Sequence, residues 1–360
     1  MKTRTIIIVV VVIVVILVAI VAYEVLTAPG PVCTSTWNCA ADYPTQVGGT
    51  YGISGQQCIG GTGYLECIGG QDANYGSRSD VYSAVLSSSG NITGWTASLN
   101  QYPKPIYAQS CAAGSGYVYC VGGSYDGNSG DDLASSYFAP LNSSGAIGTW
   151  ASTTPYPIPV DTQSCVTSSG YIYCIAGDNE TDGFYADAVP TSSVWYAPIS
   201  ASGIGTWSQT TSYPADDYFP ACFAAGGYVY CVGGADSNGN SLTTSYYAPL
   251  TASGVGPWTS TASYPVAASG QACAISSAVI YCVGGETAGG NTPTYTNGAY
   301  SAPISSVGIG TWKQSPNYPD STLTDCAIAS GYMYCMGGLD SSSVGESYIV
   351  NYASLSSLAA

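Results

Sequence analysis

The pattern of hydrophobic and polar positions divides the chain into two different parts. An unbroken apolar run of Ile, Val, Leu and Ala extends from Ile6 to Ala22. As a helix, residues 5–23 would measure about 28 Å, close to the ~30 Å hydrocarbon core of a bilayer. Further along, short apolar segments alternate with turns rich in Gly, Ser and Pro, a pattern typical of β-strands. We therefore expect a hydrophobic transmembrane or filament-core helix over 1–23, a Pro/Gly stem over 24–32 and an all-β domain over 33–360.

The apolar run has two interpretations. A retained helix would anchor the chain in a membrane or pack against sister helices, whereas a cleaved secretory signal would have a shorter apolar region and a small-x-small site. In either case, a basic flank precedes the run and an acidic chain follows it, which predicts that residues 24–360 lie outside the cytoplasm. The run is also weakly similar to the N-terminal helix of type IV pilin-like and archaeal surface-filament subunits. This resemblance implies a filament core built by residues 5–23.

Six pairs of cysteines share the spacing C-x8-C. A two-residue turn such as Ser169-Gly170 lies midway between the cysteines, so the two residues of a pair stand directly opposite each other in a β-hairpin. At a non-hydrogen-bonded position their Cα atoms would lie about 4.5 Å apart, within reach of a disulfide. Zinc is the alternative, but this spacing without histidine is not a zinc pattern. The predicted disulfides join Cys58 with Cys67, Cys111 with Cys120, Cys165 with Cys174, Cys222 with Cys231, Cys273 with Cys282 and Cys326 with Cys335.

Two further cysteines, Cys33 and Cys39, lie outside this repeat. If the chain between them were fully extended, their Cα atoms would be about 20 Å apart, too far for a disulfide. We favour a bend before Trp37 that lets them pair with each other. A bond elsewhere, including one to another subunit, is the alternative.

Each hairpin is followed by a Gly-Gly or Ala-Gly pair, a polar loop, a third strand and a tryptophan strand ending in Tyr-Pro. Six of the seven tryptophans recur from Trp37 to Trp312 at intervals of 51 to 58 residues. A period near 55 with four short strands predicts a β-propeller, and the units resemble the blade of kelch-type propellers over about residues 33–355. The last unit lacks a tryptophan strand, so we expect a six-bladed ring closed by residues 36–41 against 345–355.

Composition excludes several classes of function. The net charge is −16, only five residues are basic and histidine is absent. A nucleic-acid partner is excluded because the surface lacks cations, and without histidine there is no catalytic triad or imidazole ligand. Adjacent Asp216 and Asp217 are the remaining candidates for carboxylate chemistry on a glycosidic bond. We expect no catalytic residues and no cofactor, and little change of charge between about pH 6 and 8.

Polar loops hold the remaining candidate sites. Asp178, Glu180 and Asp182 alternate as in a calcium loop, although Val189 stands where a twelfth-position glutamate would be; solvated turn residues are the alternative interpretation. Acidic residues also gather in other loops after the Gly-Gly pairs, which we assign to the face distal to the N-terminal tether. Acceptor motifs for N-glycosylation predict possible glycans on Asn91, Asn142 and Asn179.

These features predict a non-enzymatic extracellular structural protein: a self-assembling subunit of a cell-surface filament, tube or coat. It would be held by a membrane or by sister helices through residues 5–23. The alternative is a membrane-tethered adhesin or glycan-binding receptor that uses the distal acidic face.

Overall fold

A computed structural model describes residues 33–44, 52–72, 74–125, 132–179, 189–288, 294–319, 322–340 and 348–359. The chain separates into two compact units, residues 1–32 and Cys33–Ala360. In the described ranges, no helix is both long enough and apolar enough to span a membrane. The predicted helix over 1–23 and the stem over 24–32 lie outside the described residues.

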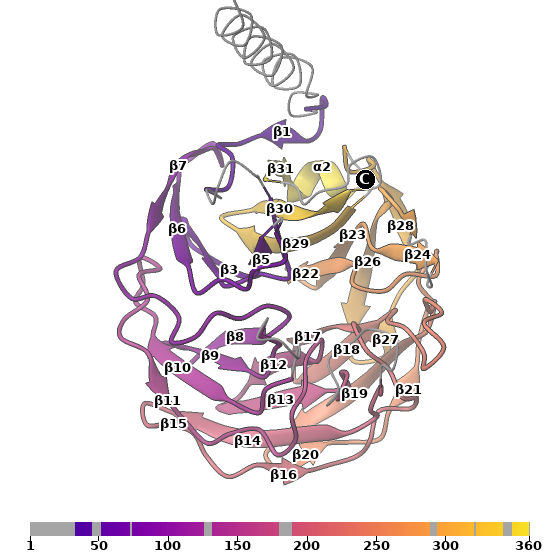
Figure 1. Cartoon of the computed structure of the whole chain (residues 1–360). Helices are drawn as coiled ribbons and strands as arrows, with labels where there is room; N and C mark the ends of the chain where they lie inside the picture. The colour runs from indigo at the N-terminus through magenta and orange to yellow at the C-terminus, as the bar shows by residue number, and fades with distance from the viewer. Residues whose placement is uncertain are drawn as a thin grey trace, which may run out of the picture. The chain divides into compact units, whose positions relative to one another are not determined.

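The second unit is an all-β propeller with six blades arranged around an axis (Figure 1). Each blade has an antiparallel hairpin at the centre, then a third and an outer strand. The innermost strands, adjacent to one another around the ring, are β3 (Gln57–Gly61), β8 (Ser110–Gly114), β12 (Ser164–Ser168), β17 (Ala221–Ala225), β22 (Ala272–Ser276) and β29 (Thr322–Ala329). Their hairpin partners are β4 (Tyr64–Ile68), β9 (Tyr117–Val121), β13 (Tyr171–Ile175), β18 (Tyr228–Val232), β23 (Val279–Val283) and β30 (Tyr332–Asp340).

The third strand extends each sheet outward and the outer strand completes it. The third strands are β6 (Val81–Leu86), β10 (Ser136–Pro140), β14 (Val194–Ser200), β19 (Ser245–Thr251), β26 (Ala299–Ser305) and β31 (Val350–Ser354). The outer strands are β7 (Ile92–Ala97), β11 (Ala151–Ser152), β16 (Ser208–Gln209), β21 (Thr259–Ser260), β28 (Lys313–Ser315) and β1 (Asn38–Cys39). We number the blades 1 to 6 in the order of their innermost strands.

Short pairings complete the loops. In blades 3, 4 and 5 the third strand turns back on β15 (Gly203–Ile204), β20 (Gly254–Val255) and β27 (Gly308–Ile309). Two further two-stranded ladders join β2 (Ile53–Ser54) to β5 (Gln71–Asp72) and β24 (Glu286–Ala288) to β25 (Thr294–Tyr295).

The six predicted hairpin disulfides are all present. In every blade the two cysteines stand opposite each other, as the two-residue turn midway between them predicts. Their Cα atoms are 4.0–4.1 Å apart. Disulfides in every blade are typical of an extracellular or secreted protein, because reducing compartments do not maintain them. In blade order the bonds join Cys58 with Cys67, Cys111 with Cys120, Cys165 with Cys174, Cys222 with Cys231, Cys273 with Cys282 and Cys326 with Cys335.

The N-terminal strand closes the ring as the sequence predicts. Strand β1 pairs antiparallel with β31, so Asn38 stands opposite Tyr352 and Cys39 opposite Asn351. The first strand of the propeller thereby becomes the outer strand of its last blade, and blade 6 is built from both ends of the domain.

The two cysteines outside the repeat pair with each other. Cys33 and Cys39 are joined with their Cα atoms 5.4 Å apart, because the chain turns between them. The amide of Trp37 donates to the Thr34 hydroxyl within this turn. The favoured local pairing is therefore confirmed, and within the described residues no cysteine is free.

After β31 the chain forms one helical turn that the sequence analysis does not predict, α2 (Leu355–Leu358). The hydroxyl of Ser354 accepts the amide of Ser357 and so caps the turn. Leu358 is buried, and its carbonyl accepts a hydrogen bond from the Ser301 hydroxyl in blade 5. The turn thus fills the junction between the last two blades.

Neighbouring blades are held by one repeated aromatic contact. In blade 1 the Trp95 indole donates to the carbonyl of Ala41 over 3.1 Å and meets the edge of Tyr43 at a centroid distance of 4.9 Å. Such a hydrogen bond and such a ring pair each contribute about 1 kcal/mol. All six junctions repeat the ring pair: Trp37–Tyr318, Tyr43–Trp95, Tyr102–Trp150, Tyr156–Trp207, Tyr213–Trp258 and Tyr264–Trp312.

Candidate functional site

Strand order assigns the loops to two faces of the propeller. Because the strands of a blade are antiparallel, the loops between first and second strands lie on the same face as those between third and fourth strands. We call this the proximal face. The loops between second and third strands, and those that join successive blades, form the distal face.

A cavity of about 270 Å³ lies on the propeller axis, lined by the residues that precede and begin the innermost strands. These residues follow the loops between blades, so the cavity is at the distal end of the axis. Its walls combine amide, hydroxyl and carboxylate groups with one aromatic ring. Lining residues include Gln56, Gln109, Gln163, Phe219, Gln271 and Asp325.

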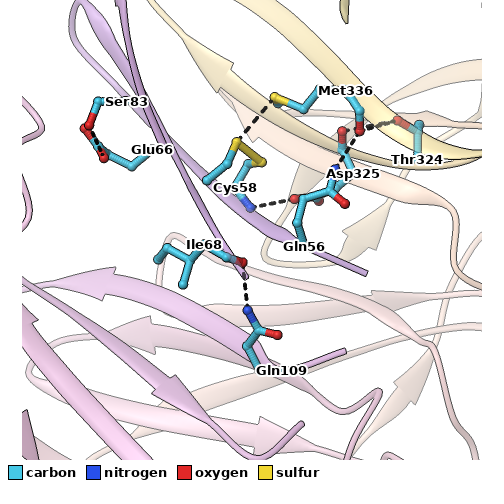
Figure 2. The surroundings of a disulfide bond; sticks show 10 residues. Gln56, Cys58, Glu66, Ile68, Ser83, Gln109, Thr324, Asp325 and Met336 are labelled. Carbon is cyan, nitrogen blue, oxygen red and sulfur yellow. Dashed lines mark hydrogen bonds between the residues drawn. A yellow bond between two sulfur atoms is a disulfide. The ribbon is translucent and has the colours of Figure 1, made fainter. Parts of the chain in front are cut away.

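Four of the five glutamines that line this cavity, Gln57 being the exception, occupy one repeated position, two residues before the first cysteine of blades 1, 2, 3 and 5. Each side-chain amide donates to the backbone carbonyl of the residue directly after the second cysteine of the preceding blade. Gln109, for example, donates to the carbonyl of Ile68 over 2.8 Å (Figure 2). The glutamines are 3–4% exposed. They therefore fasten the distal ends of neighbouring blades together.

A belt of side-chain acceptors runs partway around the cavity. The Asp325 carboxylate accepts the Cys58 amide over 2.6 Å, as Figure 2 shows. Burial raises the pKa of Asp325 to about 7, although amide donors oppose the shift. The hydroxyls of Ser110 and Ser164 accept the first-cysteine amides of the next blades over 2.8 and 3.0 Å. Alanine stands at the same position in blades 4 and 5 and offers no side-chain acceptor, so the belt is polar on one side only.

A hoop of backbone hydrogen bonds runs along the cavity mouth from blade 1 to blade 5. The residue three before the first cysteine has a positive φ, between 52° and 59°, in five blades. The amide of each bonds to the carbonyl of its counterpart in the preceding blade over 2.9–3.2 Å, in four successive steps. Two members, Thr162 and Phe219, have side chains that disfavour this conformation, at a cost of order 1–3 kcal/mol each. The members are Gly55, Ala108, Thr162, Phe219 and Gly270.

Sequence reasoning missed this hoop. Three of its five residues are not glycine, and the left-handed conformation leaves no residue-type signal there. Only alignment of the repeats against one another, with equal distance to the first cysteine, groups these positions.

On the distal face, two carboxylates meet at one serine and a third lies nearby. The hydroxyl of Ser124 bonds to Asp132 over 2.8 Å and to Asp161 over 2.9 Å. Burial, then the charge of Asp132 and more weakly that of Asp178, raise the pKa of Asp161 well above its usual value. A proton on Asp161 therefore stabilises the group.

Of the three residues of the predicted calcium loop, the structure describes only Asp178. Asp178 Oδ1 accepts the amide of Val189 over 2.6 Å, so this carboxylate holds the returning loop. Glu180 and Asp182 lie outside the described residues. In the part of the chain that the structure describes, no group of three or more His, Cys, Asp or Glu is arranged to hold a metal ion.

Asp216 and Asp217 do not form an accessible pair. Asp216 is exposed, whereas Asp217 is fully buried against Gly234 in the bend that leads into blade 4. Burial raises the pKa of Asp217 to about 8. The two carboxyl groups thus occupy different environments and do not present the joint acid and base that the sequence suggested.

Another carboxyl group with a raised pKa lies inside blade 1. Glu66 is 1% exposed and accepts the Ser83 hydroxyl over 2.7 Å (Figure 2). The other five blades have tyrosine at this position. Burial raises the pKa of Glu66 to about 7, and the serine hydrogen bond opposes the shift. The expectation of little charge change between pH 6 and 8 is therefore wrong, because buried Glu66, Asp217 and Asp325 titrate in or next to this range.

The three predicted glycosylation sites lie on different faces. Asn91 and Asn142 are in third-to-fourth-strand loops of blades 1 and 2, on the proximal face. Asn142 Oδ1 accepts both the amide and the hydroxyl of Ser144 and the amide of Ala146, which stabilises the turn. Asn179 is on the distal face. Glycan occupancy stays a prediction at all three.

Among the described residues, the loops of the proximal face carry no charged side chain. In all six blades, none of these loop residues is Asp, Glu, Lys or Arg. Ionic residues of the described propeller lie instead on the distal face, on the outer wall or inside. On the distal loops they include Asp42, Asp72, Arg78, Asp80, Lys104, Asp132, Asp161, Asp178, Asp216, Asp217, Asp236 and Glu286.

No protein-family model matches the chain, and no curated protein matches it in sequence. Many solved structures share its fold. The structure of YjhT is similar with a TM-score of 0.68 and 13% identity, and the match covers 86% of this chain and 95% of YjhT. At this identity the likeness supports the propeller fold alone.

Proposed function

We propose that the protein is a non-enzymatic, self-assembling structural subunit of an extracellular filament, tube or coat, and that its propeller is of the kelch type. The observation that carries this proposal is that every blade is reinforced in the same way. Every blade holds its own disulfide, and all six junctions repeat the same Trp–Tyr pair. A propeller in which every blade has its own disulfide suits a load-bearing role outside the cell.

Residues 5–23 supply the anchorage in this proposal. Their Ile/Val-rich surface is hidden from water either by lipid or by the same segment of sister subunits. The partners are other copies of the chain and a membrane, with glycans as a possible modification. Nucleic acid and cofactors have no part in it.

Electron microscopy of native cell-surface material tests this function. We expect regular polymers whose repeating unit is a propeller, labelled by antibodies against this chain. If native full-length protein occurs only as isolated monomers in membrane or detergent, the structural role is wrong.

The axial cavity favours a second candidate, a membrane-tethered adhesin or glycan-binding receptor. Its polar belt offers hydroxyl and carboxylate groups at the distal end of the axis, where a ligand outside the cell would approach. Saturable binding of an oligosaccharide to full-length protein, lost in Ser164→Ala and unaffected by the exposed-turn variant Ser237→Ala, would favour this function over assembly.

A further inference from the structure

We propose that the proximal face is a self-association surface, through which two copies of this chain pair back to back with their distal faces outward. This inference rests on the proposed assembly function in the form in which residues 5–23 pack against sister helices rather than in a membrane, because the chain enters β1 from the proximal side. It adds to that function the surface and the symmetry of the contact. The occupant of the face is the identical face of a second copy.

The first argument is the absence of charge from the described proximal loops. Interface centres are depleted of charged residues relative to the rest of a protein surface. Here the loops of one whole face, in all six blades, consist of Ser, Thr, Gly, Ala, Asn and apolar residues. Chance placement of charges in an acidic chain does not favour one end of the molecule, and turns elsewhere in the same blades hold most of the acids.

The second argument is the apolar content of this face. At the proximal end of four blades the second strand begins with an aromatic or apolar residue that is half-buried against a core cluster and stands directly opposite a proline of the third strand. Blade 1 has Val85 there, 74% exposed, and the turn of blade 5 presents Val307, 79% exposed. Tyrosine and apolar groups without competing charges are typical of contact surfaces. The opposed pairs are Tyr117 with Pro140, Tyr171 with Pro198, Tyr228 with Pro249 and Val279 with Pro303.

Charge distribution selects a second copy, and this orientation, as the occupant. Two distal faces repel each other because both carry an excess of carboxylates over Arg78 and Lys104. A proximal face against a distal face would take carboxylates out of water without enough cations to pair them. A contact between two proximal faces involves neither repulsion between carboxylates nor their removal from water. A patch that contacts the same patch on a second copy is the ordinary interface of a twofold pair.

This pairing and glycans on the same face exclude each other. A glycan on Asn91 or Asn142 would stand in the contact, since both asparagines lie in proximal loops. Asn142 has a turn-stabilising role that accounts for its presence without a glycan. The proposal therefore expects both positions to be unmodified in assembled material.

Charges introduced into the face test the proposal in the full-length protein. The proximal variant places a carboxylate at exposed turns of blades 1, 3 and 5 by Ser88→Glu, Ala201→Glu and Val307→Glu. Like charges would then face each other across the twofold contact and weaken association by about 100-fold or more. The matched control adds the same charge to exposed distal positions by Tyr75→Glu, Ala215→Glu and Ser237→Glu. Circular dichroism and thermal melting confirm that both variants are folded.

Light scattering and electron microscopy of the three proteins give distinguishable outcomes. Loss of association in the proximal variant alone supports the proposal. If the wild-type protein assembles and the proximal variant assembles equally well, or if assembled material carries glycans on Asn91 or Asn142, the proximal contact is wrong while the structural function stands. If the wild-type protein never assembles, the structural function and this inference both fail.

Discussion

The folded protein should lose stability as pH rises, and replacing Asp217 by asparagine should remove part of this loss. The pKa of this carboxyl group is about 8 in the fold, against an ordinary value of 3.8. The folded state therefore binds the proton more tightly than the unfolded chain. The contribution of this group to stability is highest below pH 4, falls between about pH 4 and 8, and is constant above. A shift of four units corresponds to about 5 kcal/mol in all, of which roughly 3–4 kcal/mol is lost between pH 5 and 8.

Urea unfolding followed by tryptophan fluorescence at pH 5, 6, 7 and 8, with disulfides intact, measures this difference. Asp217→Asn should lose about 3 kcal/mol less than wild type over the range, because the amide does not ionise. Asp216→Asn is the matched control, since it removes one negative charge from the exposed neighbour and retains Asp217. If Asp217→Asn and the wild type lose the same free energy between pH 5 and 8, the argument from burial is refuted.

The remaining predictions concern the ring. Gly122→Ala should destabilise the fold by about 3 kcal/mol or more, because the new Cβ would overlap a carbonyl oxygen of the next blade. Gly116→Ala is the control, since its Cβ meets no nearby atom, and it should cost about 1 kcal/mol. Denaturant melts measure both. Trp150→Phe should cost about 1–2 kcal/mol of stability in the same melts, because the Asn100 carbonyl loses its donor. Trp195→Phe is the control, because it removes an indole nitrogen without a partner and loses no hydrogen bond. Reduction should cost about 2–3 kcal/mol per hairpin disulfide at most, and non-reducing peptide maps should never join cysteines of different blades.

Much of the fold could be predicted because each repeat carries its own register marker. The two cysteines of a hairpin fix which residues oppose each other, and the count of tryptophan strands fixes how the ring closes. The same local markers say nothing about contacts between blades. For this reason the hoop that includes Thr162 and Phe219, and the capping turn at Leu355–Leu358, became visible only in the structure.

One site feature could have been found from the sequence, and another could not. Glu66 stands one residue before a second cysteine, where the other blades have tyrosine, so comparison of repeats marks it as an unusual buried carboxyl group. Asp216 and Asp217 lie in the connection between blades 3 and 4, where the sequence does not fix the direction of either side chain. Only the structure separates the two, because Asp217 is buried against Gly234 in the next turn.

The closure of the ring by β1 ties the completion of folding to the order of synthesis. Cys39 and Asn351 contact each other across 312 residues of sequence, so the first strand made has no partner until the last strand is made. Until then blade 6 lacks its outer strand and the Trp37–Tyr318 junction stays open, which leaves a sheet edge able to pair wrongly. A nascent chain that stops before β31 cannot close the circle, and its unpaired first strand remains accessible to proteases.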